Sequence, residues 1–328
     1  MSGLLIIVIF LILLAEFVNG WTDAPNSIAT VVSTKVLTPF QAVIMAAVLN
    51  ALGAFSGVAV ATTIGKGIVD PSVISLTTVA AAMVGIVIWS SFTYYFGGLP
   101  TSESHGLVAG LAGAGLATAG PSVLLWVGWK KILIGLLFSS LLGFIGGLIM
   151  MSVLYHLFAR SHPGTVRRIF GKLQILSAGF MAFSHGSNDG QKFIGVFTLA
   201  LVLGGILPEF KVPYWVILMC ALTMAIGTAT GGWKIVRTMG IKLVKLEPVN
   251  GFAVETAAAA CIELASRLGI PVSTTHTINT AIMGVGATRR FSAVRWGLGK
   301  NIVLAWILTF PVCGFIAWAV AKLLNAIF

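Results

Sequence analysis

One pair of motifs occurs twice in this chain, once in each half, within otherwise apolar sequence. In the first half an Asp segment, Gly20–Asn26, is followed by a Pro-hydroxyl-His segment, Pro100–His105. In the second half Gly186–Lys192 is followed by Pro271–His276. A repeated aspartate, helix breaker and hydroxyl cluster is hard to explain by stability alone, but it suits the transport of an ion. The chain is therefore expected to fold as two related halves.

The composition indicates a membrane protein. Of the 328 residues, 58% are apolar and only 9% are charged, against about 25% charged in a typical soluble protein. Several apolar segments reach the roughly 20 residues that a helix needs to cross a bilayer. The sequence thus predicts an all-α polytopic membrane protein. The net charge of +11 comes from basic residues in short loops between these segments, which argues against a nucleic-acid partner.

The similarity between the halves extends beyond the motifs. Residues 1–158 and 173–328 are predicted to be two copies of one unit, joined by a basic linker at 159–172. Each unit is expected to contain a helix broken at its Asp segment, a full crossing, a re-entrant hairpin with the hydroxyl segment at its tip, and a last crossing. Because three net crossings is an odd number, the second copy must be inverted in the membrane.

The distribution of Lys and Arg tests this topology and orients it. One side holds thirteen basic residues: Lys35, Arg160, Arg167, Arg168, Lys172, Lys234, Arg237, Lys242, Lys245, Arg289, Arg290, Arg295 and Lys300. The other side holds five: Lys66, Lys130, Lys131, Lys211 and Lys322. The positive-inside rule places the first side in the cytoplasm. The prediction is a multi-pass protein of the cell (inner) membrane with both termini outside.

The Asp segments are candidate cation sites. A carboxylate at the centre of a membrane costs roughly 2.5–3.5 kcal/mol on insertion scales, so Asp23 and Asp189 need a function or a partner. One such residue could belong to a structural ion pair, and Pro25 could mark an ordinary kink. Two aspartates at matching positions of inverted repeats instead indicate cation ligands.

The hairpin tips are candidate anion sites. A proline and three hydroxyl residues open each returning arm: Thr101, Ser102 and Ser104 in one, Ser273, Thr274 and Thr275 in the other. Helix capping would account for one hydroxyl per tip. Three hydroxyls near free backbone N–H groups suit a tetrahedral oxyanion. The histidines that follow, His105 and His276, are expected to make orienting hydrogen bonds rather than to bind metal.

Charge links the two kinds of site. Two aspartates repel an oxyanion, and helix dipoles with a single lysine offset that repulsion only in part. Bound cations would remove it, so cation and anion binding would favour each other, which describes symport. Four further residues are possible accessory groups: Glu16, Glu103, Lys192 and Glu255. Glu103 could be a cation or proton site or a gate residue, and Glu255 could belong to a polar seam between helices.

Taken together, the motifs resemble those of the inorganic phosphate transporter family, the sodium- or proton-coupled phosphate permeases. The most specific parts are Asp23–Asn26, His185–Lys192 and the two Pro-hydroxyl-His segments. The resemblance implies phosphate near the midplane between the tips, no cofactor beyond the transported ions, and a homodimer. It also implies cation ligands at Asp23, Asn26, Asn188 and Asp189, and phosphate ligands at the six tip hydroxyls. Pro25 and Glu103 differ from the residues that many members have, and Lys192 replaces the Asn expected from the first copy, as in many bacterial members. These differences bear on the coupling ion.

The predicted function is therefore import of inorganic phosphate by symport with a cation, sodium being favoured over protons, through alternating access. A sulfate or other oxyanion permease of the same fold is the nearest alternative. A membrane lipid-phosphate phosphatase is a remote one, because an enzyme of that kind needs an arginine clamp and Arg267 is the only arginine near a tip. A passive channel is a further alternative. The chain is not expected to be an enzyme.

Overall fold

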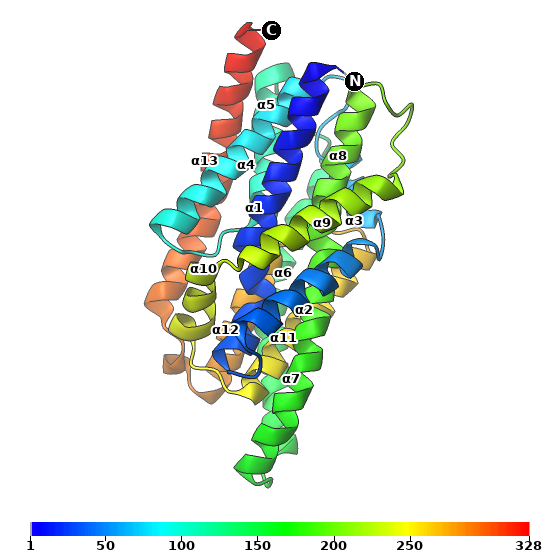
Figure 1. Cartoon of the computed structure of the whole chain (residues 1–328). Helices are drawn as coiled ribbons and strands as arrows, with labels where there is room; N and C mark the ends of the chain where they lie inside the picture. Colours follow the sequence, from blue (N-terminus) through cyan, green and yellow to red (C-terminus); the bar gives the residue numbers. More distant parts are fainter. Residues whose placement is uncertain (1, 328) are drawn as a thin grey trace.

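A computed structural model describes residues 2–327, which fold almost entirely into helices (Figure 1). The helices of the first half are α1 (Gly3–Ser33), α2 (Pro39–Ala54), α3 (Ala59–Gly67), α4 (Leu76–Phe96), α5 (Glu103–Ala119) and α6 (Trp126–Leu157). Those of the second half are α7 (Pro163–His185), α8 (Gln191–Leu203), α9 (Tyr214–Thr230), α10 (Trp233–Arg237), α11 (Pro248–Arg267), α12 (Thr274–Arg289) and α13 (Trp296–Ile327). Two π-helical segments, Gly186–Gly190 and Thr238–Leu243, continue α7 and α10.

The helices confirm the predicted fold class. By length and composition, α1, α4, α6 and α13 can each cross a membrane. Two further spans are bent pairs, α2 with α3 at 69° and α9 with the segment Trp233–Leu243 at 59°. The pairs α4–α5 and α11–α12 form the two hairpins, and each returning arm begins at a Pro-hydroxyl segment. The same order of elements therefore occurs twice.

The breaks in the spans lie elsewhere than the sequence predicted. Helix α1 continues through Pro25 without interruption, and in the second copy a π segment replaces the expected break. Proline removes one backbone N–H and so frees a carbonyl one turn earlier, at Trp21. Gly232 packs against that carbonyl and against the Pro25 ring, which allows the helix to stay intact. The sharp bends occur instead in the following span, at residues 55–58 and 231–232.

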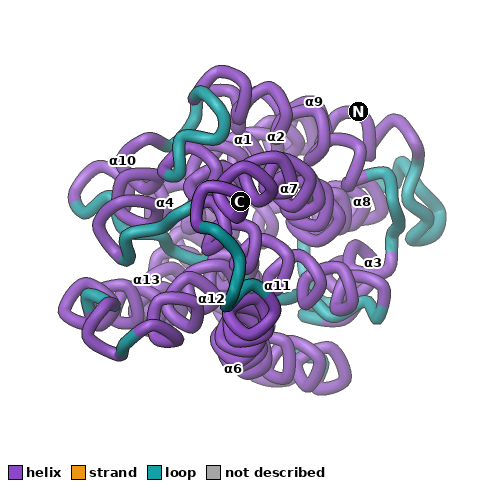
Figure 2. Tube along the Cα trace, turned by 90° about the horizontal axis from the view of Figure 1, so that it is seen from below, coloured by secondary structure: helices purple, strands orange, loops and turns teal. Residues whose placement is uncertain are grey.

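The two copies are interwoven rather than side by side. Gly20 of α1 packs against the carbonyl of Met224 in α9. Its counterpart Gly186 packs in the same way against the carbonyl of Asn50 in α2. The hairpin arms repeat this exchange, since α5 lies on α13 and α12 lies on α6. Viewed down the bundle, helices of both halves are interspersed (Figure 2).

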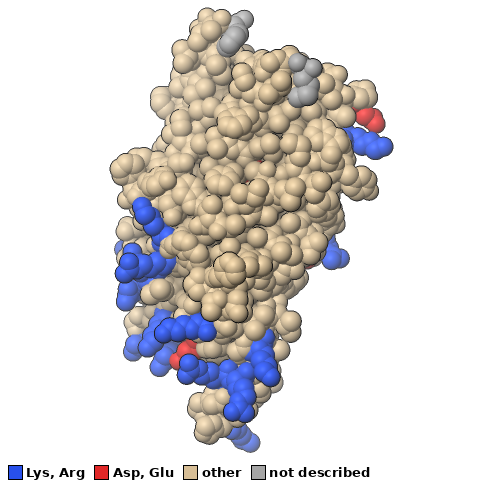
Figure 3. All heavy atoms as spheres, viewed as in Figure 1, with Lys and Arg blue, Asp and Glu red and all other residues tan. Residues whose placement is uncertain are grey.

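The ends of the bundle differ in charge. Both termini lie at one end (Figure 1), and the Lys and Arg side chains gather mostly toward the other (Figure 3). Within the predicted linker at 159–172, α7 begins at Pro163 and carries Arg167, Arg168 and Lys172 on its first turns. The boundaries of the repeats and the orientation in the membrane remain predictions.

Candidate functional site

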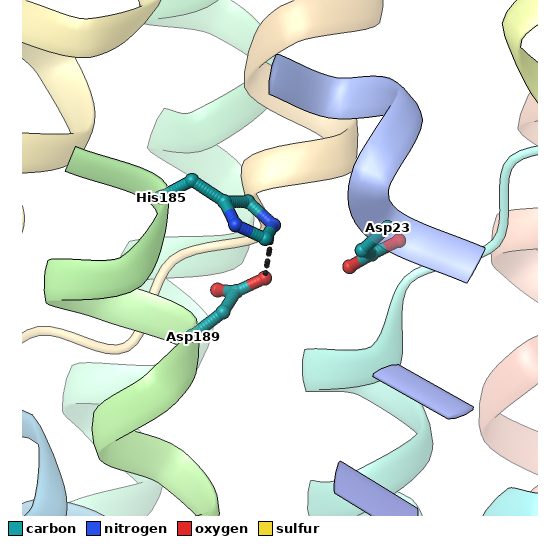
Figure 4. A group of neighbouring side chains, drawn as sticks. All are labelled: Asp23, His185 and Asp189. Carbon is teal, nitrogen blue, oxygen red and sulfur yellow. Dashed lines mark ion pairs between the residues drawn. The ribbon is translucent and has the colours of Figure 1, made fainter. Parts of the chain in front are cut away.

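The two Asp segments meet at the centre of the bundle. Asp23 and Asp189 are 2% and 1% exposed, and their carboxylates face one another across a small space shared with His185 (Figure 4). One ligand atom from each of these three residues lies within 4.8 Å of the others. His185 was not among the predicted site residues. Its position four residues before Asp189 puts both on one helix face, and this spacing could have identified it.

The second copy surrounds its aspartate with basic groups. The Lys192 ammonium contacts the Asp189 carboxylate directly. It also donates to the Ser104 hydroxyl and, at 2.9 Å, to the carbonyl of Val272. His185 Nε2 lies 3.3 Å from the other Asp189 oxygen. Asp189 is therefore held by two nitrogen groups that lie on either side of it along the helix.

The first copy surrounds its aspartate with hydroxyl and amide groups. Thr275 Oγ1 donates to Asp23 Oδ1 at 3.1 Å. Asn26 Nδ2 donates to the hydroxyls of Thr275 at 3.0 Å and Thr274 at 3.3 Å. Thr274 in turn donates to Asp189 Oδ2 at 2.7 Å. The tip of the second hairpin thus touches both Asp segments, which links the predicted cation and anion residues in one network.

The two hairpin tips meet each other. Ser273 Oγ donates to Ser102 Oγ at 2.8 Å. Each of these serines also caps its helix, because Ser102 accepts from the His105 N–H at 3.3 Å and Ser273 from the His276 N–H at 3.1 Å. The N-termini of α5 and α12 therefore point toward a common region beside the carboxylates.

Two predicted residues lie at the edge of this network. Thr101 pairs with Thr93 of α4, with 3.1 Å between the hydroxyl oxygens. The Asn188 amide donates to Ser266 on α11 at 2.9 Å, while its Oδ1 has no hydrogen-bond partner among residues 2–327. By contrast, Ser104 lies inside the network and donates to the carbonyl of Val272 at 3.0 Å.

The three accessory glutamates occupy different places, and all are buried. Glu103 accepts a hydrogen bond at 2.9 Å from Thr22, the residue before Asp23. Glu16 accepts one from Asn19 at 2.9 Å and lies a further turn away on α1. Both belong to the surroundings of the first copy.

Glu255 forms a separate cluster. It accepts hydrogen bonds from Thr30 on α1 and from Gln174 and Ser177 on α7. Thr30 lies two helical turns beyond Asp23, so this carboxylate is outside the central network. The cluster satisfies the carboxylate entirely with neutral donors.

The tip histidines pack on each other. The His105 and His276 rings meet edge to face with centroids 4.3 Å apart. His276 stacks on Trp306 at 3.7 Å and its Nδ1 lies 3.2 Å from the Ser140 hydroxyl. Neither ring nitrogen of His105 has a hydrogen-bond partner within the described chain. The expected orienting hydrogen bond is thus present in the second copy, while packing positions His105.

A pocket of about 350 Å³ adjoins the second Asp segment. Its lining includes Ser187, Gln191, Ser266 and the ion pair of Glu263 with Arg267. The residues at the matching positions of the first copy are apolar or aromatic: Trp21, Pro25, Tyr95, Phe92 and Phe96. There the Trp21 ring packs against Tyr94 and Tyr95, at centroid distances of 4.2 and 5.7 Å.

Comparison with known proteins gives a consistent result. The sequence model of the phosphate transporter family matches residues 19–166 and again residues 158–317. A protein of Rhizobium meliloti (strain 1021) named "Probable low-affinity inorganic phosphate transporter" is 46% identical over 316 residues, which are 96% of this chain and 94% of the relative. A Bacillus subtilis (strain 168) protein of the same name is 39% identical over the full length of both chains. A solved structure titled "The sodium-dependent phosphate transporter" superposes with a TM-score of 0.88 at 25% identity and covers all of both chains.

Proposed function

The chain belongs to the phosphate transporter family, and from that premise we propose that it imports inorganic phosphate together with a monovalent cation. The observation that carries the proposal is the contact of two buried carboxylates, Asp23 and Asp189, with the hydroxyls of one hairpin tip. A carboxylate attracts a cation, and a helix N-terminus attracts an anion. Their meeting in one network suits a protein that binds both ions at once.

The proposed phosphate site is the region where the hairpin tips meet. The Ser102–Ser273 hydrogen bond brings the first turns of α5 and α12 together. Backbone N–H groups and hydroxyls there can donate to phosphate oxygens without adding a permanent charge. The proposed ligands are the six tip hydroxyls, Thr101, Ser102, Ser104, Ser273, Thr274 and Thr275. Of these, Thr101 is the least central, since it pairs with Thr93.

The proposed cation site is the space between the Asp segments, with Asp23, Asn26, Asn188 and Asp189 as ligands. Carboxylate, amide and hydroxyl oxygens are the ligands that hard cations prefer. Asp23 and Asn26 both touch Thr275 and therefore share one corner of the site. The Asn188 Oδ1, which has no hydrogen-bond partner among residues 2–327, provides a further oxygen ligand. Glu16 and Glu103 add negative potential near Asp23.

Coupling follows from charge. Two carboxylates close to the hairpin tips oppose the entry of phosphate, and a cation bound between them reduces that opposition. Because such coupling is reciprocal, phosphate must raise the affinity for the cation by the same factor. We favour sodium over protons for two reasons. The groups around Asp23 offer oxygen atoms as ligands, and the similar solved structure is named sodium-dependent. Alternating access, a homodimer and an inner-membrane location with both termini outside complete the proposal.

The test is uptake of labelled phosphate into proteoliposomes. An inward sodium gradient at constant pH should drive uptake above the equilibrium level, and an inward proton gradient without sodium should drive little. The variant Asp23→Asn serves as a control that removes the cation-binding carboxylate. Uptake that is unchanged by either the sodium or the proton gradient would refute symport. Uptake driven by protons alone would reassign the coupling ion.

Substrate choice needs its own measurement. A tenfold excess of unlabelled phosphate should abolish uptake of the label, while the same excess of sulfate should leave most of it. Equal competition by sulfate would favour a general oxyanion permease of the same fold.

A further inference from the structure

We propose that Lys192 is a built-in cation. In the second copy, its ammonium group occupies the place that a transported cation occupies in the first copy. The proposal rests on the transport function proposed above. It narrows the cation site proposed above: each phosphate moves with one cation bound at the Asp23 corner, while Asp189 is a ligand of the Lys192 ammonium and takes no cation from solution.

Lys192 occupies the position of a proposed cation ligand. It follows Asp189 by three residues, just as Asn26 follows Asp23. Residues three apart on a helix lie on one face, and both side chains do reach the network of their own aspartate. The first copy thus has a neutral amide at this position, whereas the second has a positive charge.

The ammonium group has the surroundings of a bound metal ion. It contacts a carboxylate oxygen of Asp189, the hydroxyl of Ser104 and the carbonyl of Val272. These three oxygens come from the π segment, from α5 and from the loop before α12, so three elements converge on one charge. A lysine has three N–H donors, and here each has an acceptor. At 2% exposure Lys192 cannot serve as a surface charge.

The two aspartates differ accordingly. Among residues 2–327, Asp189 is paired with Lys192 and His185, whereas no Lys or Arg pairs with Asp23. A second cation placed about 4 Å from the ammonium would be repelled by about 4 kcal/mol at an effective dielectric constant of 20. The Asp189 corner is therefore closed to a further cation, and the Asp23 corner remains open to one.

A purely structural ion pair is the competing explanation. It would make Lys192 important for folding but would leave the number of transported cations unaffected by its removal. The two explanations therefore differ in the ratio of ions moved, which can be measured without comparing absolute rates.

The decisive variant is Lys192→Asn, which gives the second copy the residue of the first. Labelled sodium and labelled phosphate are counted in the same proteoliposomes, together with the charge moved per phosphate. The wild-type protein should move one sodium ion per phosphate, and Lys192→Asn should move two, which adds one positive charge per cycle. The sodium dependence of uptake should steepen, with a Hill coefficient rising from about 1 to about 2. Lys211→Asn, outside the helices, is the matched control and should change neither ratio.

Two outcomes would overturn the proposal: a wild-type protein that binds two sodium ions per chain, or an active Lys192→Asn variant with an unchanged ion ratio. The first measurement uses isothermal titration of the purified wild-type protein and needs no folded variant. If phosphate transport itself is absent, sodium-dependent thermal stabilisation without phosphate still tests the inference. A stronger dependence on sodium in Lys192→Asn than in wild type would support it, and an equal dependence would contradict it.

Discussion

The two Asp segments have equivalent backbone positions but opposite surroundings. Asp23 lies in an uninterrupted α-helix, and the side chains near it within its own copy are acidic or neutral: Glu16, Asn19, Asn26 and Glu103. Asp189 lies in a π segment between His185 and Lys192. At matching positions, the first copy has Asn19 and Asn26 where the second copy has His185 and Lys192. The two copies therefore place side chains at matching positions but differ in the charges of those side chains.

The largest effect should come from removing the paired aspartate. Asp189→Asn leaves the Lys192 ammonium buried without its carboxylate, and breaking a buried pair costs about 3–5 kcal/mol. We expect a marked loss of thermal stability, measured in detergent by the unfolding of purified protein. The double variant Asp189→Asn with Lys192→Asn should recover most of it. A single variant as stable as wild type would show that the two corners are equivalent after all.

Removing the other aspartate should affect transport instead of stability. Asp23→Asn takes away a buried carboxylate that lacks a basic partner, so folding should be preserved. Cation affinity should fall on the order of 100-fold, and phosphate affinity should fall with it through reciprocal coupling. Sodium titrations of phosphate binding measure both. If Asp23→Asn unfolds the protein while Asp189→Asn does not, then Asp23 would be the aspartate needed for stability, contrary to the assignment made here.

Substitutions of the tip hydroxyls should also affect the Asp23 corner more than the Asp189 corner, with smaller changes in sodium affinity. Thr275→Val removes a donor to Asp23 and an acceptor for Asn26, and losing a hydrogen bond to a charged group costs about 1.5–3 kcal/mol. The sodium concentration for half-maximal binding should therefore rise by about tenfold or more, since 1.4 kcal/mol corresponds to a factor of ten. Thr274→Val should raise it less, because Asp189 keeps Lys192. Equal shifts in the two variants would argue that both corners bind a transported cation.

The smallest effect should come from the pocket beside the second Asp segment. Arg267 is 77% exposed, and exposed ion pairs contribute about 0–1 kcal/mol. Glu263→Gln should therefore leave stability within 1 kcal/mol of wild type and change sodium affinity by less than twofold. Thermal unfolding and sodium titration check both values. A large change in sodium affinity would extend the charged surroundings of Asp189 out to this pocket.

The fold could be predicted from the sequence because its signals are local or repeated. Apolar segments predict spans, and the two Pro-hydroxyl segments mark the starts of α5 and α12. The repeat was recognisable because it places side chains at matching positions. The bends were misplaced because proline and glycine can each either break or kink a membrane helix. Whether the helix breaks or only kinks depends on packing neighbours such as Gly232. The sequence around the proline or glycine does not reveal these neighbours.

The sequence predicted in part which side chains gather at the centre of the bundle, but not how they contact one another. The aspartates and tip hydroxyls converge as expected, since each departs from an apolar background. The contacts of Lys192 with Ser104 and Val272 join residues far apart in the sequence, and only tertiary packing brings them together. His185 was missed because a histidine beside an apolar run more often serves packing. Its spacing from Asp189 was the available signal.

The interweaving of the halves bears on how the molecule is made. Gly113 of α5 packs against Gly314 in α13, the final helix, while Gly284 of α12 packs against Phe144 in α6. A growing chain therefore holds an unfinished glycine surface in the bilayer until its last helix is inserted. Two separately synthesised halves have complementary surfaces and should assemble when they are co-expressed. The same contacts are reciprocal, so each half completes the glycine surface of the other as in a two-fold symmetric pair.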